Sequence, residues 1–241
     1  GKSIAKKFVT EGAVVILLDI SEKNLKEAEK EFNKDNALSV VCDINNSEAI
    51  QNAIEKTCLN FGGIDIVVHS AGLAISKPLS ETTSEDWDML QNILVKGQFE
   101  LFKQATAVLK IQKKGGNFIT IASKNGLVAG PNNVAYGTAK AAQQHMTRLL
   151  AAELAKEKIR VNTVNPDGVI VGSKIWEGSW AKGRADANGI KVNDLPAFYA
   201  KRNLLNQIIT PDDIAQAVFS LVAFLDKSTG NTINVDGGMA N

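Results

Sequence analysis

The chain has 241 residues, of which 44% are hydrophobic and 22% are charged, and its 27 Lys and Arg residues nearly balance 26 Asp and Glu residues. This composition is typical of a globular protein and excludes an intrinsically disordered chain. The formal net charge is +1, and no block of basic residues could form a binding surface for nucleic acid or an anionic membrane, so we expect neither as a partner.

The sequence also excludes several kinds of targeting signal and site. No apolar run approaches the roughly 18 residues that a membrane span needs, and the first residues lack the pattern of a secretory signal. Cys42 and Cys58 are too few for a disulfide framework, and no cluster of metal-ligand residues surrounds His69 or His145. We therefore expect a cytoplasmic protein without a bound metal.

Short β-branched runs alternate along the chain with longer amphipathic stretches. The predicted strands are Ala13–Leu18, Leu38–Cys42, Ile64–His69, Asn117–Ala122, Arg160–Val164 and Thr232–Val235. The predicted helices are Lys2–Thr10, Glu22–Phe32, Ser47–Phe61, Ser84–Leu109, Val134–Lys156 and Asp212–Leu225. Because the strands are almost wholly apolar, both of their faces should be covered. The alternation predicts an α/β fold, a three-layer, doubly wound parallel sheet in a single domain of residues 1–241.

Residues with capping preferences mark the helix ends. Ser21 and Ser84 each precede acidic residues and are predicted N-caps, and Pro211 takes the first position of the last helix. The pairs Gly62–Gly63 and Gly115–Gly116 mark the ends of two long helices just before strands.

The segment from about residue 172 to residue 205 interrupts the alternation. It carries Trp176, Trp180 and Tyr199, and its periodicity is weak. Long insertions of this kind are lids or disordered loops, and the aromatic content favours a substrate lid. Lys174 and Trp176 are its candidate substrate contacts. Trp176 and Trp180 either shield the reaction from water or form a packing pair on one helix face.

Asp19 ends the first predicted strand, at the edge where doubly wound sheets bind ligands. A carboxylate there can accept hydrogen bonds from both ribose hydroxyls of an adenosine and would repel a 2′-phosphate, which favours NAD over NADP. The alternative is a solvated turn acid or a helix cap. In dinucleotide-binding folds the acid lies about 20 residues after the glycine motif, and Asp19 lies 18 residues after Gly1.

A complete glycine-rich phosphate loop is absent from the chain. Gly1 would be its last glycine, and the N-terminus of the helix Lys2–Thr10 would face the pyrophosphate. The first strand of the fold, between the Asp19 strand and the His69 strand, would then be missing too, which leaves two strands with costly unpaired edges. We therefore predict that about 10–20 upstream residues contain an apolar strand and most of a glycine-rich turn.

Tyr136 and Lys140 form a Y-x-x-x-K motif within the predicted helix Val134–Lys156. This spacing places both side chains on one helix face, where the ammonium should lower the pKa of the phenol from its ordinary value of about 10. Ser123 follows the strand Asn117–Ala122, which should abut this helix, so its hydroxyl can hold a substrate oxygen. A Tyr and a Lys at this spacing are often only a surface pair, but with the strand-end Ser they predict a catalytic site.

In this combination the sequence resembles the short-chain dehydrogenases and reductases over essentially its whole length. The residues that carry the resemblance are Asp19, Asp43, Ala71-Gly72, Ser123, Tyr136, Lys140, Val161–Pro166 and Asp236-Gly237-Gly238. The resemblance implies a Rossmann fold, an NAD cofactor and a small-molecule substrate. It also implies that Tyr136 is the general acid and base, that Lys140 binds the nicotinamide ribose, and that Ser123 orients the substrate oxygen.

The same resemblance implies a set of cofactor contacts. Asp43 and Ile44 would border the adenine. Gly72 would let the backbone approach the cofactor, and Val169 would meet the carboxamide. The complete expected set is Gly1, Asp19, Asp43, Ile44, Ser70, Ala71, Gly72, Tyr136, Lys140, Pro166, Gly168 and Val169.

Three positions depart from the family pattern. His69-Ser70 replaces a pair of Asn residues, Leu94 replaces the Asn that holds a proton-relay water, and Asp167 interrupts the usual Pro-Gly. The change at Leu94 puts that relay in doubt and leaves open another path for protons to Tyr136. His69 is one candidate for such a path, although a His at a strand end is more often a structural hydrogen bonder.

A narrower resemblance is to the C-terminal dehydrogenase half of bifunctional rhamnulose-1-phosphate aldolase/dehydrogenases, which also carry Leu at the relay position. It rests on Ala122–Leu127, Asn165–Gly168, Gly172–Trp176 and Lys227–Asn231. This resemblance implies lactaldehyde, the aldolase product in rhamnose catabolism, as substrate. It also implies an aldolase domain fused upstream of Gly1.

The direction of the reaction stays open. Oxidation of an aldehyde usually uses a Cys nucleophile, whereas Cys42 and Cys58 are predicted core residues. Lactaldehyde would have to react as its hydrate, while interconversion of an alcohol and a carbonyl needs no further group. The alternative to an enzyme is a catalytically silent or NAD-responsive scaffold. The family resemblance also implies a homo-oligomer formed through the helices Ser84–Leu109 and Val134–Lys156.

Overall fold

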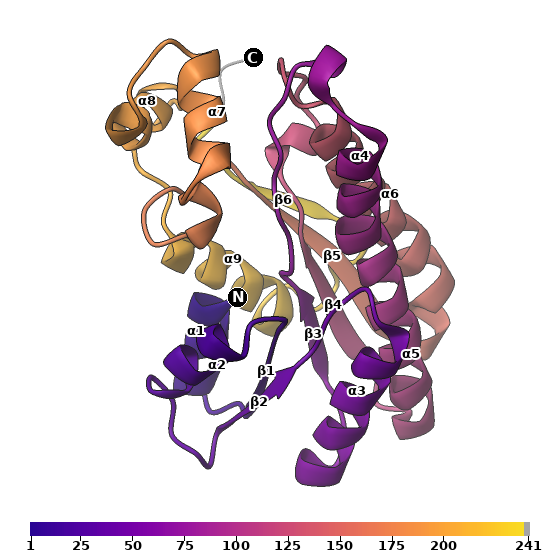
Figure 1. Cartoon of the computed structure of the whole chain (residues 1–241). Coiled ribbons are helices and arrows are strands. Elements are labelled where there is room, and N and C mark those ends of the chain that lie inside the picture. The colour runs from indigo at the N-terminus through magenta and orange to yellow at the C-terminus, as the bar shows by residue number, and fades with distance from the viewer. Residues whose placement is uncertain (239–241) are drawn as a thin grey trace.

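The computed structural model describes residues 1–238, except for the side chain of Lys174, and its strands lie close to their predicted positions (Figure 1). The strands are β1 (Val15–Asp19), β2 (Ala37–Val41), β3 (Ile66–His69), β4 (Gly116–Ile121), β5 (Ile159–Pro166) and β6 (Thr232–Val235). Every strand pair is parallel, which confirms the prediction of a parallel sheet.

The helices are α1 (Lys2–Thr10), α2 (Glu22–Glu29), α3 (Ser47–Phe61), α4 (Ser84–Leu90), α5 (Gly97–Gln112), α6 (Val134–Leu154), α7 (Ser179–Ala187), α8 (Leu195–Lys201) and α9 (Pro211–Ala223). Four of the helices, α2, α3, α4 and α9, begin at a residue whose side chain caps them. Ser21 caps α2 as predicted, because its hydroxyl accepts the Asn24 N–H at 3.3 Å. The predicted cap at Ser84 is wrong by one residue: Thr83 caps α4 and forms a capping box with Asp86.

The helices cover both faces of the sheet (Figure 1). On one face α3, α5 and α6 enclose a core that contains Phe102 and Phe118, whose rings stack with centroids 4.5 Å apart. On the other face α1 and α9 bury Phe8, Ile119 and Val218. These three layers form the expected Rossmann-like α/β architecture. In residues 1–238, no helix combines the length and apolar character that crossing a membrane requires.

The sheet is interrupted between β1 and β3. β1 pairs with β2, whereas β3, β4, β5 and β6 form a separate sheet in that order. Within the described chain no backbone hydrogen bond joins β1 to β3, and a cavity of about 1230 Å³ extends between these two edges. The facing edges therefore lack the strand neighbours that normally satisfy backbone groups in a parallel sheet. A first strand at this place, as expected from the sequence, stays a prediction.

The predicted helix Ser84–Leu109 consists of three elements rather than one. A π-helical segment, Gln91–Lys96, lies between α4 and α5 and contains the fully buried Leu94. Directly after it, a Cβ added at Gly97 would stand 2.8 Å from Cγ1 of Ile44, so glycine allows α5 to pack closely on the loop after β2. Short π segments inside helices occur frequently at functional sites.

Residues 172–205 form ordered structure rather than a disordered loop. They contain α7, α8 and two short 3₁₀ turns, Lys174–Trp176 and Val192–Asp194. Leu195 and Tyr199 are buried in a small core of this segment. Its function as a substrate lid stays a prediction.

Candidate active site

One cavity gathers almost all of the residues that the sequence singles out. It opens at the carboxyl ends of the strands and continues between β1 and β3. The predicted site residues that line it are Gly1, Asp19, Asp43, Ile44, Ser70, Ala71, Gly72, Ser123, Tyr136, Lys140, Pro166, Gly168, Val169 and Trp176. Lys174 is the exception, because its side chain lies outside the described residues.

Two carboxylates lie where β1 and β2 end. Asp19 Oδ1 accepts the backbone N–H of Ser21 at 2.8 Å, and Asp43 Oδ1 accepts that of Asn45 at 2.9 Å. Each turn uses one carboxylate oxygen, and the second oxygen of Asp19 forms no hydrogen bond with the described residues. Asp19 is therefore a turn acid that still has an acceptor for ribose hydroxyls.

Small residues line the cavity between these carboxylates and Tyr136. A Cβ added at Gly1 would stand 3.3 Å from Ser70 Oγ, so the start of α1 lies close to the loop after β3. Ala71 and Gly72 continue this loop along the cavity. Backbone N–H groups at a helix start favour phosphate groups. The residues present thus fit an extended dinucleotide, with α1 at its phosphates and Asp19 at its ribose.

Ser123, Tyr136 and Lys140 meet at the end of β4. Ser123 follows that strand directly, and α6 carries Tyr136 in its first turn and Lys140 one turn later. Ser123 shares a hydrogen bond with the Tyr136 phenol, and its Oγ accepts the Asn125 N–H at 3.2 Å. The three residues are only 4% to 8% exposed. The structure brings the expected group together, while the role of each member stays a prediction.

Burial controls the ionisation of this group. It raises the pKa of Tyr136 to about 12, an effect that the hydrogen bond with Ser123 opposes. Burial also lowers the pKa of Lys140 to about 7, and Lys140 Nζ lies 5.7 Å from the Tyr136 ring centroid. The expected lowering of the Tyr136 pKa is therefore wrong, because desolvation of the phenolate outweighs its stabilisation. At neutral pH Tyr136 is a protonated phenol, able to donate a proton.

Lys140 is held by uncharged acceptors. Its Nζ donates to the Ile121 carbonyl at 3.0 Å and to Gln143 Oε1 at 2.8 Å. Gln143 Nε2 donates to the Leu94 carbonyl at 2.8 Å and lies 3.3 Å from His69 Nδ1. Burial lowers the pKa of His69 to about 3, so the ring is neutral at physiological pH and Nδ1 can accept. His69 is therefore a structural hydrogen bonder.

Aromatic side chains cover Tyr136. The Trp180 ring lies 5.3 Å from the Tyr136 ring, and Trp176 packs edge-on against Trp180 at 5.9 Å. Trp176 also packs edge-on against Tyr199 at 5.2 Å. The two tryptophans are therefore a packing pair, although they lie on a 3₁₀ turn and on α7 rather than on one helix face as predicted. Through Trp180 this pair also covers the phenol.

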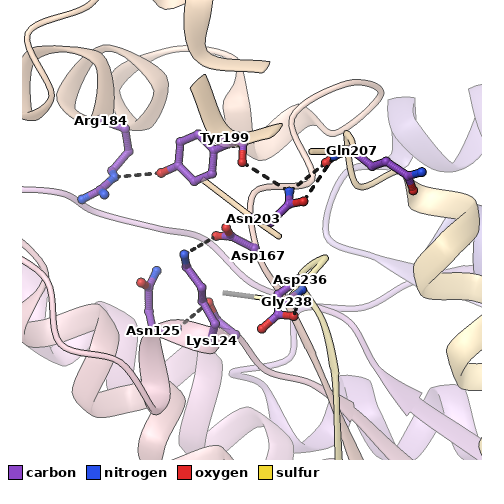
Figure 2. Close-up of polar contacts among 10 residues, drawn as sticks. Lys124, Asn125, Asp167, Arg184, Tyr199, Asn203, Gln207, Asp236 and Gly238 are labelled. Carbon is purple, nitrogen blue, oxygen red and sulfur yellow. Dashed lines mark hydrogen bonds and ion pairs between the residues drawn. The ribbon is translucent and has the colours of Figure 1, made fainter. Parts of the chain in front are cut away.

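A buried ion pair joins the loops that follow β4 and β5 (Figure 2). Lys124 Nζ lies 2.8 Å from Asp167 Oδ1, and the side chains are 7% and 6% exposed. Lys124 directly follows Ser123, and Asp167 is the residue inserted between Pro166 and Gly168. The pair thus fixes the strand end that positions Ser123.

Tyr199 of α8 lies beside this pair (Figure 2). Its ring centroid is 6.0 Å from Lys124 Nζ, and its hydroxyl accepts from Arg184 Nε at 3.2 Å. A Cβ at Gly168 would stand 2.5 Å from Tyr199 Cδ1, so the tyrosine ring requires glycine there. No role was predicted for Lys124, and Tyr199 was predicted only as one of the aromatic residues of the lid. One signal in the sequence could have revealed the ion pair: the basic Lys124 and the inserted acid Asp167 each come shortly after one of two neighbouring strands.

Comparisons with known proteins agree with this fold. Residues 1–240 match the family model described as enoyl-(acyl carrier protein) reductase. The uncharacterized oxidoreductase YuxG of Bacillus subtilis is 40% identical over 99% of this chain, which spans 35% of the length of YuxG. The NAD-dependent glycerol dehydrogenase of Listeria innocua is 33% identical over 74% of this chain and 70% of its own. The crystal structure of sorbitol-6-phosphate 2-dehydrogenase SrlD from Erwinia amylovora has a TM-score of 0.90 at 22% identity, covers 99% of this chain and 94% of its own, and shares the fold.

Proposed function

This chain belongs to the short-chain dehydrogenase/reductase family of oxidoreductases, which use a nicotinamide cofactor, and we propose that it transfers hydride between NAD and a small hydroxy-aldehyde, polyol or sugar-derived carbonyl. The observation that carries this proposal is the joint burial of Ser123, Tyr136 and Lys140 on one cavity. The glycerol dehydrogenase relative supports a polyol substrate. The narrower sequence resemblance makes lactaldehyde, within a longer aldolase-fused protein, the first substrate to test.

Each member of the group has a distinct role in this proposal. Ser123 and Tyr136 hold the substrate oxygen, and the Tyr136 hydroxyl donates a proton when a carbonyl is reduced and accepts one when an alcohol is oxidised. When bound, the nicotinamide supplies the hydride or takes it up. The Lys140 ammonium stabilises negative charge that develops on the Tyr136 oxygen. Trp180 covers the phenol and excludes water.

The two cysteines support interconversion of an alcohol and a carbonyl. Cys42 and Cys58 pack in the core that contains Phe102, and burial raises the pKa of the Cys42 thiol. A raised pKa disfavours the thiolate that attacks an aldehyde. Oxidation through a thiohemiacetal is therefore the less favoured reaction, and Tyr136 is the group that moves the proton.

The test is cofactor reduction by the protein in its full natural length, with NAD⁺ or NADP⁺ and with glycerol, 1,2-propanediol or lactaldehyde. We expect turnover with at least one of these substrates and a preference for NAD⁺. Binding of NADH without turnover of any substrate would instead favour the scaffold alternative.

Asp19 should set the cofactor preference. Asp19→Ser keeps an oxygen for the turn to Ser21 but removes the charge, so we expect the KM for NAD⁺ to rise about 10- to 100-fold, as loss of charged hydrogen bonds implies. The KM for NADP⁺ should fall because a 2′-phosphate is no longer repelled. Steady-state kinetics with both cofactors measure the ratio of the KM for NADP⁺ to the KM for NAD⁺. Asp35→Ser is the control, because Asp35 is an exposed acid outside the cavity. An unchanged ratio would remove Asp19 from the cofactor site.

We also propose that an extended apolar segment from outside the 241 residues lies between β1 and β3. Residues 14–20 and 63–70 line the two sides of the cavity there, and most of them are apolar. A parallel strand at this place would pair with both free edges and make the sheet continuous. It would also lead into the start of α1, where a glycine-rich turn is expected.

Hydrogen exchange tests this strand. In a longer protein that includes the preceding part of the reading frame, the amides of β1 and β3 should exchange more slowly than in the 241-residue chain. The amides of β4 provide the internal control, because both edges of that strand are already paired. Equal exchange of β1 and β3 in the two proteins would contradict the proposal.

A further inference from the structure

The Lys140 ammonium is buried without a counter-ion. Lys140 is 4% exposed, and it forms no ion pair with the described residues. The titratable groups that face it are Tyr136 on its own helix and His69 at the end of β3. The neighbouring strand β4 and the π segment contribute only the carbonyls of Ile121 and Leu94 to the network around it. Dipoles rather than opposite charges must therefore stabilise this cation.

Gln143 supplies the only side-chain acceptor that the structure records for this ammonium. Its Oε1 lies 2.8 Å from Lys140 Nζ, and Gln143 is fully buried one helical turn beyond Lys140. A hydrogen bond to a buried charged group contributes more than one between neutral groups. This contact is therefore the strongest local stabilisation of the cation that the described side chains provide.

The orientation of the Gln143 amide is fixed by its other end. Nε2 lies 2.8 Å from the Leu94 carbonyl and 3.3 Å from Nδ1 of the neutral His69, so each of its two hydrogens has an acceptor. A flipped amide would point its NH₂ group at the ammonium and its oxygen at the Leu94 carbonyl. Both changes are unfavourable, and so the oxygen is held toward Lys140.

We propose that Gln143 is a positioning residue: its side-chain oxygen fixes the Lys140 ammonium beside Tyr136, and His69 with the Leu94 carbonyl fixes that oxygen. The inference rests on the proposed function, because it acts through Lys140 on the proton transfer at Tyr136. The Leu94 backbone carbonyl thus supports the amide, and the amide oxygen holds the ammonium.

The test measures the titration of Lys140 directly in the full-length protein. Labelling with [¹³Cε]lysine gives an NMR signal for Lys140, assigned by its absence in Lys140→Met. Gln143→Leu removes the acceptor and should lower the Lys140 midpoint by about one to two pH units. Gln143→Glu puts a carboxylate at the same atom and should raise the midpoint. A merely structural role for Gln143 does not predict shifts of opposite sign.

Kinetics provide the second readout. In Gln143→Leu, kcat for alcohol oxidation near neutral pH should fall about 10- to 100-fold, with the pH at which the rate levels off displaced to lower pH and the substrate KM nearly unchanged. Gln98→Leu is the matched control, because Gln98 is also fully buried and neither side-chain polar atom has a partner in the described structure. Gln143→Met, which is unbranched, replaces the Leu variant if that variant does not fold.

Two outcomes separate this inference from the proposed function. An unchanged Lys140 midpoint in Gln143→Leu or Gln143→Met, or the same shift in Gln98→Leu, overturns the role of Gln143. Full activity of Tyr136→Phe together with opposite shifts of the Lys140 midpoint would support the Gln143 contact and overturn the proposed proton transfer.

Discussion

Tyr136→Phe should lower kcat/KM for hydride transfer by about 10²- to 10⁴-fold, the range that a general acid or base contributes. The substitution removes only the phenol oxygen that shares a hydrogen bond with Ser123. The aromatic ring is kept, and with it the packing on Trp180 at 5.3 Å. Because the fold and the cavity wall are preserved, cofactor affinity should change little. The measurement is the initial rate of NADH formation together with the Kd for NADH.

Tyr199→Phe is the matched control for this variant. Both tyrosines are 7% exposed, and each hydroxyl is hydrogen-bonded to one side chain, Ser123 for Tyr136 and Arg184 for Tyr199. Only Tyr136 adjoins Lys140. We expect Tyr199→Phe to keep most of the activity. Equal turnover of the unmodified protein and Tyr136→Phe would remove Tyr136 from the mechanism.

The raised pKa of Tyr136 also predicts how each direction of the reaction depends on pH. Burial raises this pKa to about 12, so the phenolate that serves as base increases about tenfold per pH unit below that value. The Lys140 ammonium that stabilises this phenolate is lost above its pKa of about 7. The rate of alcohol oxidation should therefore rise up to about pH 7 and level off above it, whereas carbonyl reduction, which uses the protonated phenol and the ammonium, should fall above pH 7. Initial rates in both directions from about pH 5 to pH 9 check this, and an oxidation rate that stays flat below pH 7 contradicts it.

Asp167→Asn should destabilise the fold by about 3–5 kcal/mol, the cost of removing one partner of a buried ion pair. Lys124 and Asp167 are 7% and 6% exposed, and removal of the carboxylate takes away the ion pair that stabilises this buried ammonium. Because the pair joins the loops after β4 and β5, the position of Ser123 should also loosen. Urea unfolding measures the stability change, and the free energy of unfolding is the quantity compared.

The pH dependence of that loss has a definite sign. Burial lowers the pKa of Lys124 below its ordinary 10.5, and Asp167 opposes this shift. A lysine with a lowered folded-state pKa costs stability below that pKa, and the cost disappears as pH rises toward the unfolded value. The deficit of Asp167→Asn should therefore be largest near neutral pH, and it should shrink in acid, where protonation of the carboxylate breaks the pair in the unmodified protein as well. Asp226→Asn, which breaks the exposed pair with Lys227, should change the free energy of unfolding far less at any of these pH values.

Much of the fold could be predicted because its signals are local. Apolar runs and N-caps such as Ser21 determine strands and helix starts within a few residues of chain. The break in the helix Ser84–Leu109 was not predictable in this way, since residues 91–96 contain no Pro or Gly that would mark it. Its conformation depends on contacts made by Gly97 and Gln143 with distant elements.

The candidate site shows the same division. Ser123, Tyr136 and Lys140 could be placed together from strand and helix positions alone. The pKa of Tyr136 could not be predicted from the sequence, because it depends on how completely the surrounding elements exclude water. The partners Lys124 and Asp167 lie far apart in the sequence, and only the parallel alignment of β4 with β5 brings their charges together.

The aromatic cover over Tyr136 provides the protein with an optical probe of its own. Two of its three tryptophans, Trp176 and Trp180, line the cavity, while Trp87 lies outside it. Indole emission overlaps the absorption of a reduced nicotinamide, so a bound NADH would quench most of this fluorescence by energy transfer. The entry and departure of NADH can thus be followed in real time without a label, and Trp180→Phe would identify which ring reports them.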